Sequence, residues 1–510
     1  MKMKMNLTRL LNGLTRRRGA RWIALASAGA LGALLLPMPA AAQPPALSEG
    51  MVCTKSTSLT KGYATFLLTA GTYYIKTPDG NNSFMWGYGN GNGSFQYPGP
   101  VLCMNEGDNV TITLKNTLPF PTSLVFPGNT RIRANGKLEQ LDAGTNGLAQ
   151  AAPAGTPAAP KSITYTFKAT NPGTFIYESG TDPEVQVLMG MVGAIVVRPR
   201  LNPNDLTNPT SCASLSKAGT LPPGSVYAPG EALVYDDCAS AYNPNREFMH
   251  LLTEVDPHMH VAIEKATCAD VAPIDKPNCA LSAPTYDMTK YVPRYWFING
   301  RAFPDDITPN FAPALPQQPY GALVHVTPKN FDPGTALAPN PDYNPLPALV
   351  RFLSGGPVTY PFHPHSNHDQ QIGTDGRELV AAGGVSLSFD RFGFVMAPGQ
   401  TAESLFNWSD GQGFAANPPG IGVPEPSIQN RTDGQYWSGT PYLGVRLPLG
   451  AGKTQWNACG EYYQFAHSHA LFQITTYGAS GGGMLTLIRV DPPKSWQANH
   501  EKCDNNGPGY

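Results

Sequence analysis

The sequence predicts an all-β protein that contains two Greek-key β-sandwich domains in tandem. Glycine and proline are abundant, with 53 and 51 copies in 510 residues, whereas charged residues make up only 14% of the chain. Both residues break long helices and separate short strands. Several runs rich in β-branched and aromatic residues have the alternating or apolar pattern of strands. These runs are 109–114, 162–167, 193–197, 232–235, 349–353 and 484–490.

Residues 1–42 have the order of a secretory signal peptide. Seven basic residues and no acidic residue accompany an apolar run at 22–36, and the small residues 40–42 form a cleavage site. The arginines at 16–18 allow either the general secretory route or the twin-arginine route. We therefore expect a periplasmic or secreted protein. No later stretch is apolar enough to predict a membrane span.

The charge of the chain argues against nucleic acid as a partner. Loss of the seven basic residues of the signal segment would shift the net charge from −1 to −8. Nucleic acids and anionic membranes are bound through basic patches, so a moderately acidic protein is a poor candidate for either partner.

The mature chain divides into two blocks. We expect the first domain at 51–200, a linker rich in Pro, Asn and Ser at 201–229, a second domain with insertions at 230–493, and a tail at 494–510. A third domain is the alternative. However, the stretch between Trp408 and the tail is short for another complete sandwich.

The eight cysteines all follow the signal segment. An even number of cysteines in an exported chain, with no C-x-x-C pair, favours disulfides over metal thiolates. Pairing between sequence neighbours is expected, although spacing alone does not fix the connectivity. The expected pairs are Cys53–Cys103, Cys212–Cys238, Cys268–Cys279 and Cys459–Cys503.

Two H-x-H sequences in the second block predict a metal site. One contains His363 and His365, and the other contains His467 and His469. Residues i and i+2 of a strand project from the same face, so each pair directs two imidazoles toward one point. Two such pairs on neighbouring strands would offer four nitrogen ligands, which suit copper, zinc, iron or nickel.

Other histidines nearby have weaker patterns. His368 would join the site if the strand bends after His365. A third H-x-H, at His258 and His260, follows an Asp-Pro pair that predicts a turn. We therefore expect a structural role for this third pair.

The two histidine segments resemble the copper motifs of the multicopper oxidases, which are enzymes built from cupredoxin domains. Residues 360–368 are similar to the third motif of the family, and 467–484 to the fourth. The resemblance implies tandem cupredoxin-like domains with copper as the cofactor. It assigns copper to the two histidine pairs and makes Met484 a further candidate ligand. Weaker matches occur in order at 98–100, 106–110, 114–116, 173–177, 190–193, 299–301, 375–376, 397–401 and 460–463.

The chain departs from the family at many of its copper ligands. The first two H-x-H motifs of the family correspond to 123–128 and 178–180, which contain no histidine. In the second domain Ser468, Gln473 and Tyr360 stand where the blue-copper site has its cysteine and two histidines.

The first domain departs in the same way when it is compared with two-domain copper nitrite reductases. Glu178, Ser179 and Gln186 occupy the His, Cys and His positions, and only Met191 remains. Blue copper depends on a thiolate with two imidazoles. The four-electron reduction of oxygen is therefore not expected from this chain.

Three functions follow as hypotheses. The first is a copper oxidoreductase with a reduced copper centre, which takes electrons from a small reductant or a redox protein. The second is a protein that binds or delivers copper in the periplasm without catalysis. The third is a cupredoxin scaffold in which the metal is incidental. By analogy with two-domain copper oxidases, a homo-oligomer such as a trimer is compatible with each hypothesis.

Overall fold

The computed structural model describes most of the chain after the signal segment. The described residues are 48–91, 94–139, 142–143, 146–222, 225–267, 284–326, 346–365, 369–407, 462–490, 503–504 and 507–508. Within Ala46–Tyr510 the chain forms one compact unit. The signal segment, His368, the predicted disulfides Cys268–Cys279 and Cys459–Cys503, and most of the tail fall outside the described residues and remain predictions. The predicted domain boundaries also remain predictions.

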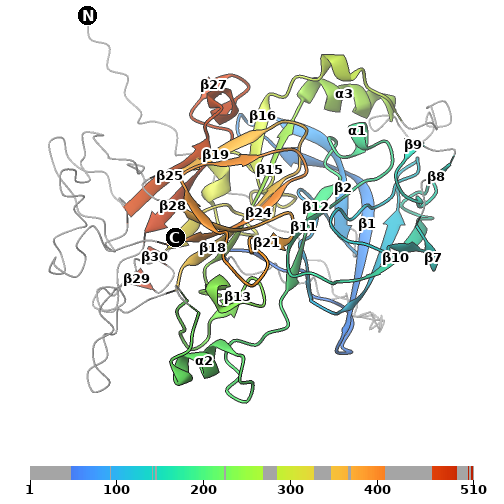
Figure 1. Ribbon diagram of the computed structural model, residues 1–510. Coiled ribbons are helices and arrows are strands. Elements are labelled where there is room, and N and C mark those ends of the chain that lie inside the picture. Colours follow the sequence, from blue (N-terminus) through green and yellow to red (C-terminus); the bar gives the residue numbers. More distant parts are fainter. Residues whose placement is uncertain are drawn as a thin grey trace, which may run out of the picture. The chain divides into compact units, whose positions relative to one another are not determined.

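The first sandwich is built from residues 63–198 and is blue to green in Figure 1. Its larger sheet has the order β3-β2-β1-β5-β10-β6-β7. The bounds are β1 Tyr63–Lys76, β2 Asn82–Asn90, β3 Phe95–Gln96, β5 Asn109–Asn116, β6 Arg133–Ala134, β7 Lys137–Leu138 and β10 Lys161–Lys168. The smaller sheet has the order β11-β12-β4, with bounds β4 Leu102–Asn105, β11 Gly173–Glu178 and β12 Val192–Arg198. Leu68, Ile112 and Ile195 represent the buried core between the two sheets.

The second sandwich is built from residues 247–490. One sheet has the order β16-β15-β18-β24-β20-β21, with β22 beside β20. Its bounds are β15 Glu247–Val255, β16 Tyr295–Ile298, β18 Ala348–Ser354, β20 Asp369–Thr374, β21 Arg377–Glu378, β22 Phe389–Arg391 and β24 Thr401–Phe406. The other sheet has the order β17-β28-β25-β19-β23. Its bounds are β17 Val324–Val326, β19 Tyr360–Pro364, β23 Phe394–Met396, β25 Tyr462–Ser468 and β28 Leu485–Val490.

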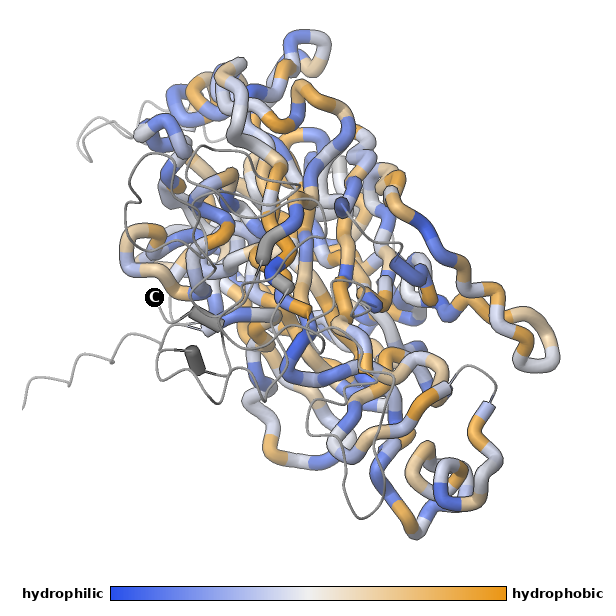
Figure 2. Tube along the Cα trace, turned by 90° about the vertical axis from the view of Figure 1, so that its left-hand side faces the viewer, coloured by the Kyte–Doolittle hydropathy of each residue, from blue (hydrophilic) through white to orange (hydrophobic). Residues whose placement is uncertain are grey.

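The strands follow the pattern that the sequence predicts. Along β5 and β19 every second residue is buried, so one face of each strand lies in the core and the other faces outward. In Figure 2, which colours the chain by hydropathy, orange and blue residues alternate along many stretches of the tube. Phe352, Phe362 and Phe394 come from both sheets of the second sandwich and pack together in its core. The fold is therefore all-β, with tandem cupredoxin-like sandwiches, as predicted.

The two sandwiches repeat one pairing scheme. In the first, β1 pairs with β5 in parallel and β5 pairs with β10 antiparallel. In the second, β15 pairs with β18 in parallel and β18 pairs with β24 antiparallel. In the other sheets, β4 lies parallel to β12 and β17 lies parallel to β28. The antiparallel neighbours of β12 and β28 are β11 and β25, so β11 corresponds to β25 and β12 to β28.

A shared apolar cluster joins the two sandwiches. Tyr73 and Val192 of the first pack with Met249, Phe297 and Leu353 of the second. Buried polar contacts lie at the same junction: the backbone N–H of Thr174 donates to Glu403, and the Thr401 hydroxyl donates to the carbonyl of Thr174. The two domains are thus held together by burial and by directed hydrogen bonds.

The described helices are short. They are α1 Pro183–Gln186, α2 Cys212–Ala218 and α3 Pro257–Ala266, with 3₁₀ turns η1 Cys238–Ser240, η3 Met288–Lys290, η4 Asp305–Ile307 and η6 Leu471–Ile474. Two-residue strands complete the set: β8 Asp142–Ala143, β9 Asn146–Gly147, β13 Ala232–Leu233, β14 Ala241–Tyr242, β26 Thr475–Thr476, β27 Ala479–Ser480, β29 Cys503–Asp504 and β30 Gly507–Pro508. Among the described residues, no helix combines the length and the apolar character that a membrane span requires.

The predicted turn at His258 and His260 is wrong, because these residues lie in α3. Asp256 caps the helix by accepting the His258 backbone N–H, and Pro257 fits its first turn. His260 is buried and its ring contacts the carbonyls of Phe84 and Leu188 in the first sandwich. The structural role expected for this pair is consistent with these contacts.

Two of the predicted disulfides are present. Cys53 bonds to Cys103 and Cys212 bonds to Cys238. The second bond connects α2, in the predicted linker, to η1.

Candidate metal centre

Two paired strands position the four predicted histidines. β19 carries His363 and β25 carries His467, and these two residues are direct cross-strand partners. His365 and His469 follow the ends of the two strands. The His365 backbone N–H donates to the carbonyl of Phe465, and that of His469 donates to the carbonyl of Pro361. The antiparallel register therefore extends over both pairs and places all four side chains on one face of the sheet.

The four imidazole rings form one cluster. The ring centroid of His363 is 4.8 Å from that of His365, 5.8 Å from that of His467 and 5.3 Å from that of His469. The Nε2 atoms of His365 and His467 are 3.0 Å apart. Two nitrogens that bind one metal ion at about 2.0–2.1 Å are about 2.8–3.4 Å apart for bond angles from about 90° to tetrahedral. This pair therefore already has the separation of two ligands on one ion.

Backbone carbonyls orient two of the rings. Nδ1 of His363 lies 2.6 Å from the carbonyl oxygen of Phe392, and Nδ1 of His467 lies 2.7 Å from that of Ser468. A carbonyl only accepts, so each Nδ1 carries the proton and each Nε2 presents a lone pair. Partners of this kind behind metal-binding histidines fix the ring and its tautomer.

The local electrostatics favour neutral rings. Burial, together with repulsion from His467, His363 and His469, lowers the pKa of His365 to about 4. Burial also lowers the pKa of His467, and the Ser468 carbonyl opposes this effect only in part. Neutral imidazole is the form that binds metal.

The arrangement is not a complete metal site as it stands. Among the described residues, no three His, Cys, Asp or Glu side chains are already grouped to hold a metal ion. The His365–His467 pair is close enough, whereas His363 and His469 would have to rotate toward it. Met484 lies elsewhere: it is fully buried in the core with Phe362, on the opposite face of the sheet from the histidines.

A surface pocket of about 640 Å³ opens beside the cluster. His363 and His469 form part of its wall, together with Phe392 and Val395. The side chains of Phe392 and Val395 are 61% and 60% exposed. A small molecule could therefore reach the two histidines from solvent through a largely apolar opening.

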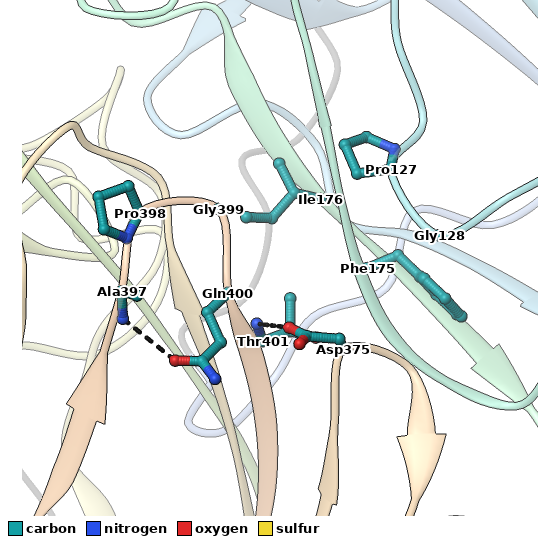
Figure 3. A pocket seen from close by; sticks show the side chains of 10 residues that line it. All are labelled: Pro127, Gly128, Phe175, Ile176, Asp375, Ala397, Pro398, Gly399, Gln400 and Thr401. Atoms are coloured by element: carbon teal, nitrogen blue, oxygen red, sulfur yellow. Dashed lines mark hydrogen bonds between the residues drawn. The ribbon is translucent and has the colours of Figure 1, made fainter.

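A second pocket, of about 360 Å³, lies where the sandwiches meet (Figure 3). Figure 3 shows Pro127 and Phe175 of the first sandwich opposite Asp375 and Gln400 of the second. The Asp375 carboxylate accepts the Thr401 backbone N–H, and the Gln400 amide oxygen accepts the Ala397 N–H. These polar groups support the turns around the pocket, and the pocket contains none of the four histidines.

The blue-copper position of the second domain does not fit a copper ion. The Ser468 hydroxyl donates to the Gln473 amide oxygen, and the Gln473 amide donates to the carbonyl of Thr359 at 3.1 Å. The Tyr360 hydroxyl points to Glu254 instead. No thiolate or imidazole is present at this position, which excludes a blue-copper centre here.

A family model described as multicopper oxidase matches residues 72–202. Over these residues the chain is similar to the multicopper oxidases. The matched segment lies in the first sandwich, which lacks the histidine pairs. Copper is the cofactor that this similarity implies.

Curated relatives match the chain over part of their own length. A copper-containing nitrite reductase from Pseudomonas chlororaphis is 32% identical over 170 residues, which are 32% of this chain and 41% of that protein. Laccase abr2 from Aspergillus fumigatus is 34% identical over 112 residues, which are 21% of this chain and 16% of that protein. The chain thus spans less than half the length of these relatives.

Among solved structures, the blue copper oxidase from Nitrosomonas europaea is similar with a TM-score of 0.46 and 16% identity. The similarity covers 83% of this chain and 85% of that protein.

Sequence reasoning missed the groups that orient and surround the histidines. The carbonyl of Phe392 is contributed by the segment between β22 and β23, and backbone carbonyls have no sequence signal. The exposed aromatic Phe392, beside Arg391 and Gly393, was the available hint of a functional surface.

Proposed function

We propose that this protein is an exported copper oxidoreductase with a reduced copper centre held by His363, His365, His467 and His469. The observation that carries the proposal is the 3.0 Å separation of the His365 and His467 Nε2 atoms, one from each H-x-H pair. The similarity of residues 72–202 to the multicopper oxidases supports copper as the ion.

Bound copper would supply a centre that cycles between two oxidation states. The protein would hold the ion through neutral imidazoles and orient two of them through the carbonyls of Phe392 and Ser468. The pocket at His363 and His469 would admit a small reductant or the surface of a redox protein.

Copper binding or delivery without catalysis is the second candidate. The observation that favours it is the Ser468–Gln473 hydrogen bond, which replaces the thiolate through which electrons would enter. The exposed position of His469 would also suit transfer of the ion to a partner. Turnover of a reductant by the copper-loaded protein separates the two functions. A delivery protein should bind copper tightly and should not turn over the reductant.

The first test is the copper content of the protein with His467 replaced by alanine. The substitution removes one of the two closest nitrogens. Loss of a hydrogen-bond partner of a metal ligand already lowers metal affinity roughly 10–100-fold. Loss of the ligand itself should therefore lower the copper affinity by at least about 100-fold. The measurement is mass spectrometry of metal in the purified protein, together with its electron paramagnetic resonance spectrum.

His258→Ala is the matched control, since the His258 side chain is 64% exposed on α3. It should keep the copper content of the parent. Full retention of copper by His467→Ala would exclude the histidine cluster as the site. A folded parent that takes up no copper at all would favour the scaffold hypothesis.

A further inference from the structure

Four side chains of the first sandwich converge in its interior at a point that no function explains. The hydroxyl oxygens of Thr122 and Ser179 are each 2.7 Å from the amide oxygen of Gln186. The Thr122 oxygen is also 3.5 Å from the Ser179 oxygen and 3.8 Å from the sulfur of Met191. All four side chains are essentially fully buried. We call this group the first-domain polar cluster.

The second sandwich contains the same arrangement. Its serine, Ser468, donates to the amide oxygen of Gln473, as Ser179 donates to Gln186. Each glutamine then donates its amide N–H to a backbone carbonyl: Gln186 to Pro121 at 3.0 Å and Gln473 to Thr359 at 3.1 Å. Met484 accompanies this second group: its backbone carbonyl accepts the N–H of Ser468 and its N–H donates to the carbonyl of Gln473.

Strand register shows that the two groups occupy equivalent positions. Val125 pairs with Glu178 in the first sandwich as His363 pairs with His467 in the second. Each serine directly follows the second residue of these pairs. Thr122 lies three residues before Val125, as Tyr360 lies three residues before His363, so Thr122 and Tyr360 correspond. Met191 directly precedes β12, and Met484 directly precedes the equivalent strand β28.

We propose that the first-domain polar cluster is a closed metal site, in which hydrogen bonds fill the space of a copper ion and keep copper out of this domain. The 2.7 Å contacts are shorter than the roughly 3.3 Å between donors on one tetrahedral ion with bonds of about 2.0 Å. The hydroxyls and the amide present hard oxygen donors, whereas copper with a thioether prefers thiolate and imidazole partners. The methionine remains because it also packs in the core.

The proposal concerns side chains remote from the histidine cluster, so it can fail or succeed independently of the proposed function. The test replaces Thr122 by His, Ser179 by Cys and Gln186 by His, and leaves Met191 unchanged. After addition of copper, the triple variant should bind one more copper per chain than the parent. It should also gain the intense visible absorption of a copper thiolate, which we expect the parent to lack. The double variant Thr122→His/Gln186→His, which keeps Ser179, should lack this absorption.

Two results would overturn the proposal. One is a folded triple variant, with the circular dichroism of the parent, that binds no additional copper. The other is copper in the parent that Ser179→Ala removes, because the native cluster would then bind metal itself.

A single substitution tests the closure even if the triple variant does not fold. Gln186→Leu deprives the Thr122 and Ser179 hydroxyls of their shared acceptor. It should lower the thermal midpoint by several degrees and leave the copper content unchanged. An unchanged midpoint would show that the hydrogen bonds do not close the site.

Discussion

Replacing Arg351 by alanine is expected to lower the free energy of unfolding by about 3–5 kcal/mol, because it leaves a buried charge without one of its partners. Arg351 is fully buried on β18 and donates to the Glu247 carboxylate at 2.7 Å and to the Thr174 hydroxyl at 2.9 Å. Arg198 also donates to Glu247, at 2.7 and 2.8 Å. Because Thr174 and Arg198 belong to the first sandwich, the loss weakens the junction between the domains. Urea denaturation of parent and variant measures the difference.

The effect of Arg351→Ala should depend on pH. Burial alone would raise the pKa of Glu247, but the guanidiniums of Arg351 and Arg198 outweigh burial and hold this pKa below its ordinary value. The contribution of the ionised carboxylate is therefore present above the unfolded pKa and is lost as the pH falls through the folded pKa. The difference in the free energy of unfolding between parent and variant should therefore become smaller at acidic pH.

Lys290→Ala is the control for this prediction. Lys290 pairs with Asp287 at 3.1 Å, but both side chains are largely exposed, and such pairs contribute about 0–1 kcal/mol. If Arg351→Ala were no more destabilising than Lys290→Ala, the buried network would not hold the domains together.

The sheet pattern could be predicted from the sequence because it is local. The run 109–114 lies within β5, Asn109–Asn116, and the run 349–353 lies within β18, Ala348–Ser354. In both strands alternating or continuous apolar residues face buried surfaces. The histidine cluster was also predictable, since the period of a strand puts both members of an H-x-H pair on one face. The meeting of the two pairs follows from the register of β19 and β25.

Features that depend on distant partners could not be predicted. The sequence around His258 suggested a turn, yet α3 forms because Asp256 caps it and because Met259 and Ile263 pack against the first sandwich. The Asp-Pro pair is equally suited to a helix start, and only the tertiary contact decides between the two.

The first-domain polar cluster could be predicted only in part. Ser179 and Gln186 could be assigned as replaced ligands and Met191 as a retained one, but Thr122 has no motif and is placed by the register of Val125 with Glu178.

Replacing Glu254 by glutamine is expected to stabilise the protein at alkaline pH and to have little effect near pH 4. Glu254 is almost fully buried on β15 and accepts the Tyr360 hydroxyl. Burial raises the pKa of Glu254 to about 8, although the Tyr291 hydroxyl, 3.4 Å away, opposes the rise. A glutamine keeps an oxygen for the Tyr360 hydroxyl and carries no ionisable proton.

The direction of this pH effect on stability follows from proton binding by Glu254. The folded protein keeps the Glu254 proton up to about pH 8, whereas the unfolded chain releases it near the ordinary value of 4.5. The contribution of the protonated carboxyl to stability is therefore complete below about pH 4.5 and is lost as the pH rises toward 8. A difference of this size between the two pKa values corresponds to about 5 kcal/mol at most. Thermal midpoints of parent and variant between pH 4 and pH 9 measure it. The difference between the two midpoints should widen from about pH 4.5 to about pH 8 and then level off.

Glu139→Gln provides the comparison. Glu139 is half-buried, and burial raises its pKa to about 7. Because solvent reaches this carboxyl, the difference in thermal midpoint between parent and Glu139→Gln should also grow with pH. This difference should be clearly smaller than the one for Glu254→Gln. A Glu254→Gln protein whose midpoint exceeds that of the parent equally at pH 4 and pH 9 would show that packing, and not the buried proton, governs the junction of β15 with Tyr360.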